Sequence, residues 1–274
     1  MSILQIKILC PDSLKEELMA VLTPLEFEGF WDNGDTILAY IDREQFNHKL
    51  FYDTLSAYEL ENNYSFEELA EINWNEEWEK NFDPVLIDEK LYIRASFHPA
   101  GQYPYEIVIN PKMSFGTGHH STTRLSAILM MHLPLKDKTV LDMGCGTGIL
   151  SILADRMGAT YVLGVDNDAW SHENALDNIQ GNNCRNVEVK LGSTDAAKGK
   201  AFDVVISNIT KNINLTLLPD LSQLVSNQGY LILSGFLDFD LNEMESKARS
   251  LGFETREHLS EQSWQGLCMQ KTTL

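Results

Sequence analysis

Apolar and polar residues at the start of the chain alternate first with the period of a strand and then with that of a helix. LQIKIL alternates along residues 4–9, which predicts a strand, and DSLKEELMAVL places its leucines on one face of a helix. Asp12 and Ser13 precede the first of these leucines and are expected to cap that helix. EGFWDNGDTILAYI then predicts two strands joined by a hairpin turn at Asn33 and Gly34.

The same region continues with a helix expected across Gln45–Tyr58 and a strand near Tyr64–Leu69. The resulting β-α-β-β-α-β order is that of a ferredoxin-like α+β domain, which we expect over residues 1–70. The acidic stretch INWNEEWEKNF comes next, and it predicts a short linker helix at Ile72–Phe82, within residues 71–83.

Strand and helix patterns alternate over residues 84–274, the second expected domain. The strands PVLID, LYIRASF and YEIVIN come first. TVLDMG, YVLGVD, VEVKLG, FDVVISN and YLILSGF then alternate with helices expected over Ile149–Met157, Ala169–Gln180 and Asn212–Val225. This alternation predicts an α/β domain with a doubly wound parallel sheet. Ligands of such sheets bind at the carboxyl ends of the strands, near the point where the strand order reverses.

Composition narrows the class of protein. With 274 residues, 43% of them apolar, the chain can bury the cores of two domains. No stretch approaches the roughly 20 apolar residues of a membrane span, and the first ten residues lack the pattern of a signal peptide. The four cysteines are scattered and the histidines lack ligand spacing, so we expect free thiols in a reducing cytoplasm and no metal site.

The negative charge is concentrated in the first third of the chain. Residues 1–85 hold nineteen Asp and Glu and five Lys and Arg, a net charge of −14 out of −19 for the whole chain. Such a surface repels phosphate backbones, so we expect no direct binding of nucleic acid there. It suits a basic protein partner, and the alternative is that the charge only keeps the protein in solution.

Three glycines follow the strand TVLDMG within five residues, in the stretch VLDMGCGTGIL. Turns that bind nicotinamide dinucleotides favour the spacing G-x-G-x-x-G. Here Gly144, Gly146 and Gly148 are spaced G-x-G-x-G. The spacing therefore disfavours a nicotinamide cofactor, although it is compatible with a tight turn that binds no ligand.

Two carboxylates at the ends of neighbouring strands separate the possible cofactors further. Asp142 precedes the glycines, where an anion is unfavourable beside a pyrophosphate but favourable beside the ammonium and sulfonium of S-adenosyl-L-methionine. Asp166 ends the next strand and can bind the ribose hydroxyls of either cofactor. Together they favour S-adenosyl-L-methionine.

Further motifs make the chain resemble one family of class I methyltransferases. INPKMSFGTGHHSTTR, FDVVISNI, LILSGF and NWNEEWEKNFDPV are similar to stretches of the ribosomal protein L11 methyltransferase family, and the resemblance covers nearly the whole chain. It implies a monomeric, cytoplasmic enzyme with a substrate-recognition domain at residues 1–70. Its expected activity is methyl transfer from S-adenosyl-L-methionine to lysine side chains, α-amino groups or both of a basic large-subunit ribosomal protein, L11. Ser121 departs from the family, which usually has proline there, and NIT replaces its NIL.

The resemblance also implies four cofactor contacts, each with a physical role. They fall on Thr123, whose hydroxyl would come from a helix start, and on Gly144, where a Cβ would collide with the methionine part. Asp166 would bind the ribose, and the amide of Asn208, at the end of FDVVISN, would face the methyl group.

No residue is assigned as a catalytic acid or base. Asp142, His119 and His120 are near the motifs in sequence only. A lysine of pKa about 10.4 requires roughly 4–5 kcal/mol to become neutral at pH 7, and a nearby sulfonium with partial desolvation lowers that pKa. Two alternatives stay open: a class I methyltransferase of a small molecule or another protein, and an NAD-dependent oxidoreductase.

Overall fold

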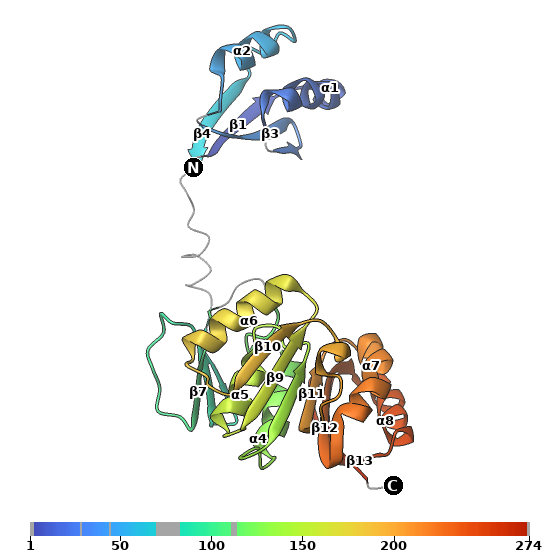
Figure 1. The fold of residues 1–274 in the computed structure, drawn as a ribbon. Coiled ribbons are helices and arrows are strands. Elements are labelled where there is room, and N and C mark those ends of the chain that lie inside the picture. The colour runs from blue at the N-terminus through green and yellow to red at the C-terminus, as the bar shows by residue number, and fades with distance from the viewer. Residues whose placement is uncertain (1–2, 28, 44, 70–82, 111–113, 273–274) are drawn as a thin grey trace. The chain divides into compact units, whose positions relative to one another are not determined.

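The chain forms two compact units, Met1–Phe82 and Asp83–Leu274, each described here by itself (Figure 1). The computed structural model describes residues 3–27, 29–43, 45–69, 83–110 and 114–272. The linker helix predicted over Ile72–Phe82 lies outside these residues.

The described part of the first unit is a four-stranded antiparallel sheet with two α-helices, in the strand order β2-β3-β1-β4. Its elements are β1 (Ile3–Leu9), α1 (Asp12–Leu22), the 3-10 turn η1 (Thr23–Leu25), β2 (Gly29–Asn33), β3 (Thr36–Asp42), α2 (His48–Ser56) and β4 (Tyr64–Leu69). Strands and helices follow one another in the predicted β-α-β-β-α-β order. The helix expected from Gln45 begins at His48 instead, because the Asn47 side chain accepts a hydrogen bond from the Leu50 N–H (3.1 Å) and caps it.

The expected capping of α1 by Asp12 and Ser13 is wrong. Pro11 is the N-cap residue, no side chain caps the helix, and Asp12 already lies in its first turn. The Asp12 carboxylate instead pairs with Lys15 at 2.6 Å. Lys15 is buried and also donates to the carbonyl of Gly34, and this hydrogen bond ties α1 to the hairpin turn between β2 and β3.

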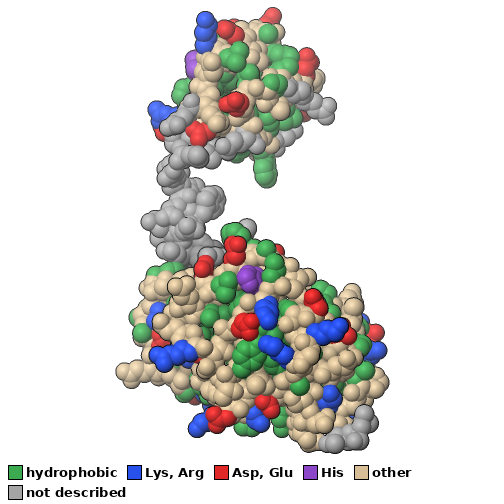
Figure 2. Space-filling view, viewed as in Figure 1, with side chains coloured by type: hydrophobic (Ala, Val, Ile, Leu, Met, Phe, Trp, Pro, Cys, Tyr) green, Lys and Arg blue, Asp and Glu red, His purple; other side chains and the backbone are tan. Residues whose placement is uncertain are grey.

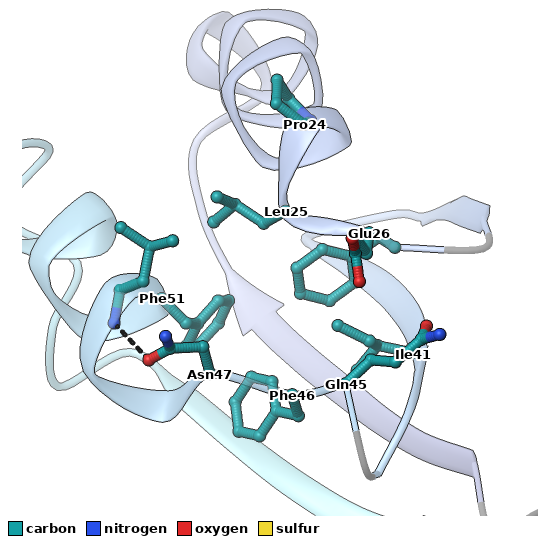
Figure 3. A pocket seen from close by; sticks show the side chains of 10 residues that line it. Pro24, Leu25, Glu26, Ile41, Gln45, Phe46, Asn47 and Phe51 are labelled. Carbon is teal, nitrogen blue, oxygen red and sulfur yellow. Dashed lines mark hydrogen bonds between the residues drawn. The ribbon is translucent and has the colours of Figure 1, made fainter.

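A small pocket of about 250 Å³ lies in the first unit between η1, the end of β3 and the start of α2. It is lined by Pro24, Leu25, Glu26, Phe27, Ile41, Gln45, Phe46, Asn47, Leu50 and Phe51. Figure 3 shows the apolar side chains around it and the capping bond of α2 at its edge. Acidic side chains are spread over the visible face of the unit rather than gathered in one patch (Figure 2).

Seven strands within residues 114–272 form one sheet in the order β10-β9-β8-β11-β12-β14-β13. They are β8 (Thr139–Met143), β9 (Tyr161–Asp166), β10 (Val187–Leu191), β11 (Phe202–Asn208), β12 (Val225–Leu237), β13 (Phe253–Glu261) and β14 (Trp264–Lys271). Strands β8 to β12 are parallel, as predicted. The sequence analysis did not predict β13 and β14, which extend the sheet as an antiparallel pair.

Helices cover both faces of this sheet, which confirms the predicted doubly wound architecture (Figure 1). They are α4 (Ser121–Met131), α5 (Ile149–Arg156), α6 (Ala169–Gly181), α7 (Lys211–Leu224) and α8 (Leu241–Ser250), with the 3-10 turns η2 (Thr194–Ala197) and η3 (Asp238–Asp240). Successive residues of the strands alternate between two cores: Val140 packs in the core that contains α4, α5 and α6, and Leu141 packs in the core that contains α7 and α8.

A small three-stranded sheet precedes α4 and packs against α4 and α5. Its strands are β5 (Val85–Ile87), β6 (Leu91–Arg94) and β7 (Tyr105–Val108). Asn182, at the end of α6, anchors it by accepting from the Val108 N–H (2.9 Å) and donating to the Val108 carbonyl (2.6 Å).

Candidate active site

A cavity of about 340 Å³ opens at the edge of the large sheet where the parallel strands end. Strand β8 has β9 on one side and β11 on the other, so the chain reverses its direction of winding here, which is where such sheets bind ligands. The cavity is lined by Phe115, His120, Thr122, Gly144, Gly146, Asp166, Asn167, Ser171, Asn208, Ile209, Thr210, Ile213, Gly235 and Trp264.

The glycine loop between β8 and α5 forms the floor of this cavity. Gly144, Gly146 and Gly148 all have positive φ, of 74°, 54° and 78°. A Cβ on Gly146 would lie 2.3 Å from the Phe115 carbonyl oxygen, and one on Gly144 would lie 2.3 Å from the Cγ2 atom of Ile209. The protein's own packing therefore already requires a bare backbone at both positions.

Asp166 presents a fixed carboxylate at the end of β9. One carboxylate oxygen accepts from the Gly146 N–H (2.8 Å) and the other from the Asp168 N–H (3.0 Å). Each oxygen has a second lone pair. Because both backbone donors hold the group in place, it can accept further hydrogen bonds from hydroxyl groups in the cavity without reorganising.

Asn208 ends β11 with a polar atom that has no partner among the described residues. Its Oδ1 atom is buried and accepts no hydrogen bond from any residue that the structure describes. The following turn is held by the fully buried Asn214, which donates to the Ile209 and Ser234 carbonyls, at 2.9 Å each. A buried polar atom without a partner costs free energy, so its place at the cavity indicates a ligand group there.

Thr123 is the one predicted contact that does not line the cavity. It lies in the first turn of α4, is buried, and has a hydroxyl oxygen without a hydrogen-bond partner. Its neighbour Thr122 lines the cavity instead. The structure thus brings Gly144, Asp166 and Asn208 together around the cavity. Thr123 is the next residue along α4 after Thr122 and does not itself line the cavity.

Asp142 does not face the cavity, contrary to the expectation that it lies beside a sulfonium. It is 1% exposed and accepts from both the hydroxyl (2.6 Å) and the backbone N–H of Ser151, in the first turn of α5. The N-cap of α5 is Gly148, which has no side chain to cap the helix, and Asp142 takes over that role from the preceding strand. Burial raises the pKa of Asp142 to about 6.

The two adjacent histidines have different surroundings. His119 does not line the cavity, and its ring nitrogens contact the Thr117 hydroxyl (3.1 Å) and the Asp83 carbonyl (2.9 Å). His120 lines the cavity and is the N-cap of α4, where its Nδ1 accepts from the Thr122 N–H (3.3 Å). Burial, together with the Arg124 charge, lowers the pKa of His120.

Phe115, Ile209 and Trp264 also line the cavity, and the sequence analysis assigned no role to any of them. A role for Phe115 could have been predicted from the sequence, because Phe115 belongs to the motif SFGTGHH. Trp264 had no local signal: it starts β14 and reaches this edge only because β14 runs antiparallel to β12, opposite Leu237.

Comparison with known proteins decides the family. The model of the ribosomal protein L11 methyltransferase family (PrmA) matches residues 8–272. The chain belongs to the ribosomal protein L11 methyltransferase family. Two relatives named ribosomal protein L11 methyltransferase are those of Phocaeicola vulgatus, 39% identical over 261 residues with 93% of each chain covered, and of Porphyromonas gingivalis, 38% identical over 268 residues with 94% and 92% covered.

Solved structures agree with this family assignment. The ribosomal protein L11 methylase of Lactobacillus delbrueckii subsp. bulgaricus superimposes with a TM-score of 0.65 at 27% identity, over 70% of this chain and 100% of that one. A methyltransferase from Pyrococcus furiosus shares the fold at 17% identity, with a TM-score of 0.53 over 61% and 90% of the two chains. The protein is a member of a methyltransferase family with a Rossmann-like sheet, as predicted.

Among the described residues, no three His, Cys, Asp or Glu come together in a group that could hold a metal ion. No helix in the described ranges is long and apolar enough to cross a membrane.

Proposed function

We propose that this member of the L11 methyltransferase family binds S-adenosyl-L-methionine in the cavity and methylates lysine side chains, α-amino groups or both of ribosomal protein L11. The observation that carries the proposal is the Asp166 carboxylate, held by two backbone N–H groups beside the bare glycine loop. The unpartnered Oδ1 atom of Asn208 across the cavity supports it, and so do the names of the relatives.

The residues present fit this cofactor. Asp166 would accept hydrogen bonds from the ribose hydroxyls, and the backbone at Gly144 would approach the methionine part. Asn208 would place its amide near the methyl group of the cofactor. Thr123, the residue after Thr122, would contribute its hydroxyl, which has no partner among the described residues, as a further contact to the cofactor. When bound, the cofactor supplies an electrophilic methyl group on sulfur.

The surroundings of the acceptor favour a neutral amine without a dedicated base. Phe115, Ile213 and Trp264 contribute apolar surface to the cavity, and desolvation there lowers the pKa of an entering amine. The Nδ1 atom of His120 is engaged by the N–H (3.3 Å) and the hydroxyl (2.9 Å) of Thr122, so it is not presented to the acceptor. The role of the protein is to orient and desolvate the amine, and we assign no general base.

Recognition of the acceptor protein is proposed for the first unit. Residues 1–85, which include this unit, carry a charge of −14 that suits a basic ribosomal protein, and such a partner would be met in the cytoplasm. The pocket at Leu25, Phe46 and Phe51 would take an apolar side chain of that partner (Figure 3). We propose that the enzyme works as a monomer, with direct binding of nucleic acid playing no part.

Titration calorimetry with S-adenosylhomocysteine and with NAD, followed by a transfer assay, tests the proposal. We expect saturable binding of S-adenosylhomocysteine alone, and then methyl incorporation into purified ribosomal protein L11 that mass spectrometry locates on amino groups. Lysozyme, a basic protein of another fold, is the control acceptor. Binding of NAD would favour an oxidoreductase, and equal methylation of lysozyme, or none of L11, would favour another acceptor.

A further inference from the structure

The aromatic rings of Phe115, His120 and Trp264 lie next to one another at the cavity. None of them is among the residues proposed to contact the cofactor. The ring centroids of Phe115 and His120 are 5.2 Å apart, and those of His120 and Trp264 are 4.8 Å apart. Both pairs meet edge to face, with interplanar angles of 61° and 66°. The three rings come from separate segments: the loop before α4, the N-cap of α4 and the start of β14.

The surroundings of the middle ring, His120, favour its neutral form. The Nδ1 atom of His120 accepts the Thr122 N–H, which leaves the proton of the neutral ring on Nε2. A second proton on Nδ1 would replace this cap by donation to the Thr122 hydroxyl, which lies 2.9 Å away. Since burial and the neighbouring Arg124 also lower the pKa of His120, the ring does not repel a cation at neutral pH.

Trp264 and Asp166 belong to strands that are not neighbours in the sheet. Asp166 is the only Asp, Glu, Lys or Arg among the described residues that line the cavity, and it ends β9. Trp264 starts β14, and the sheet places β8, β11 and β12 between these two strands. A cation bound at the aromatic end would therefore meet ring faces and edges, and the charges that act on His120 there belong to Arg124 and Glu261, which pair with each other at 2.5 Å.

We infer that Phe115, His120 and Trp264 form a seat that binds the acceptor's fully methylated, quaternary ammonium group, which has no proton to lose, through its positive charge. Aromatic faces attract alkylammonium ions, tryptophan most strongly, and quaternary ammonium ions are bound in proteins by such rings. Each added methyl group removes an N–H donor, which a carboxylate would need, whereas ring faces still attract the cation. The inference rests on the proposed function, because it places the acceptor at this end of the same cavity.

Two uncharged-backbone probes of equal shape test the seat. One is N-acetyl-Nε-trimethyllysine methylamide, and the other is the same molecule with a carbon atom in place of the quaternary nitrogen. Each is titrated into the full-length protein, with and without S-adenosylhomocysteine, and followed by tryptophan fluorescence and by ligand NMR. We expect the cation to bind at least about tenfold more tightly than its carbon isostere.

Substitutions at Trp264 decide which group supplies this preference. Trp264→Leu keeps an apolar side chain but removes the ring, so the preference should fall to less than about threefold, while Trp264→Phe should retain most of it. Trp31→Leu is the matched control, because Trp31 is exposed in the first unit. Thermal unfolding of each variant shows whether the fold is kept.

The inference is overturned if the two probes bind equally to the unaltered protein, if the cation does not bind at millimolar concentration, or if Trp264→Leu weakens both probes alike. A failure to bind S-adenosylhomocysteine would count against the proposed function instead. The preference for the cation is measured without that ligand as well, so the two failures are told apart.

Discussion

Asp142 and Asp166 are carboxylates at the ends of neighbouring strands, and the protein uses them differently. Asp142 is buried beneath the glycine loop and caps α5 through Ser151, whereas Asp166 faces the cavity with both oxygens held by backbone N–H groups. The two carboxylates differ in their exposure: Asp142 is buried, and Asp166 lines the cavity. Burial raises the pKa of Asp142, whose two donors come from one residue, whereas Asp166 at the cavity keeps lone pairs for a ligand.

Replacing Asp142 by Asn should change how stability depends on pH. The pKa of Asp142 is raised from 3.8 to about 6 in the folded state, so the folded protein holds this proton more tightly than the unfolded chain. The contribution to stability is therefore complete below pH 3.8 and is lost as the pH rises through 6. At neutral pH the loss is on the order of 2–3 kcal/mol.

Asp142→Asn has no such proton and still accepts the Ser151 hydroxyl. We expect the unaltered protein to lose stability relative to the variant between about pH 4 and about pH 7, as measured by chemical unfolding across that range. Since all other titrating groups are shared, the difference between the two curves isolates Asp142. Parallel curves would show that Asp142 is not a strained, buried carboxylate.

Asp166→Ala should weaken the binding of S-adenosylmethionine by roughly 1–3 kcal/mol, because charge-assisted hydrogen bonds to the ribose are lost. Calorimetry measures this directly. Asp168→Ala is a matched control: Asp168 caps α6 through the Ser171 N–H and does not line the cavity. An unchanged dissociation constant in folded Asp166→Ala protein would remove Asp166 from the site.

The element that builds the site is the unit of β8, the glycine loop and α5. The loop begins at the end of a buried strand and leads straight into a helix whose N-cap, Gly148, has positive φ. Phe115 and Ile209, from neighbouring segments, pack against this loop at Gly146 and Gly144. The loop is therefore shaped by two contacts that are remote in sequence as well as by its own glycines.

Gly144→Ala separates the loop's own packing from cofactor binding. The new Cβ would lie 2.3 Å from Ile209 and sit at a φ of 74°, so we expect lower thermal stability and no measurable binding of S-adenosylmethionine. Adding Ile209→Ala should recover part of the stability, because it removes the collision, but should not restore binding. Recovered binding in the double variant would mean that Gly144 serves Ile209 rather than the cofactor.

At the scale of the whole molecule, each unit has a core of its own. Ile6, Leu18 and Phe51 belong to the core of the first unit, and the large sheet buries two further cores between itself and its helices. The net charge also differs between the two parts of the chain, since residues 86–274 carry only −5 of the total of −19. The described cavity residues all belong to the second unit.

A chain that begins at Asp83 should bind S-adenosylhomocysteine about as tightly as the full chain but should no longer methylate ribosomal protein L11. Methylation by the full chain should also weaken between about 0.05 M and about 0.3 M salt, because exposed charges are screened beyond roughly 8 Å at physiological ionic strength. Methyl incorporation into purified L11 measures both. Equal activity of the shortened chain would show that the first unit does not recognise the acceptor, and a flat salt response would leave solubility as the role of its charge.

The sequence by itself determined the elements and the residues whose behaviour is local. Alternating strand patterns and turn chemistry depend on near neighbours, so the succession of strands β1 to β12 along the chain and the glycine loop could be predicted, whereas β13 and β14 were missed. Gly144, Asp166 and Asn208 could be placed at one edge because parallel strands end together. The N-terminus of α1 was missed, because Pro11 and the pairing of Asp12 with Lys15 overrode an ordinary capping preference.

Only the tertiary structure decided which polar groups face the cavity and which aromatic rings complete it. Asp142 turns inward because the N-terminus of α5 lacks a capping side chain, a demand that arises only when helix and strand pack. Trp264 joins His120 because β14 runs antiparallel to β12 and returns to the edge where the parallel strands end. Both results depend on contacts between segments distant in sequence, which no local pattern encodes.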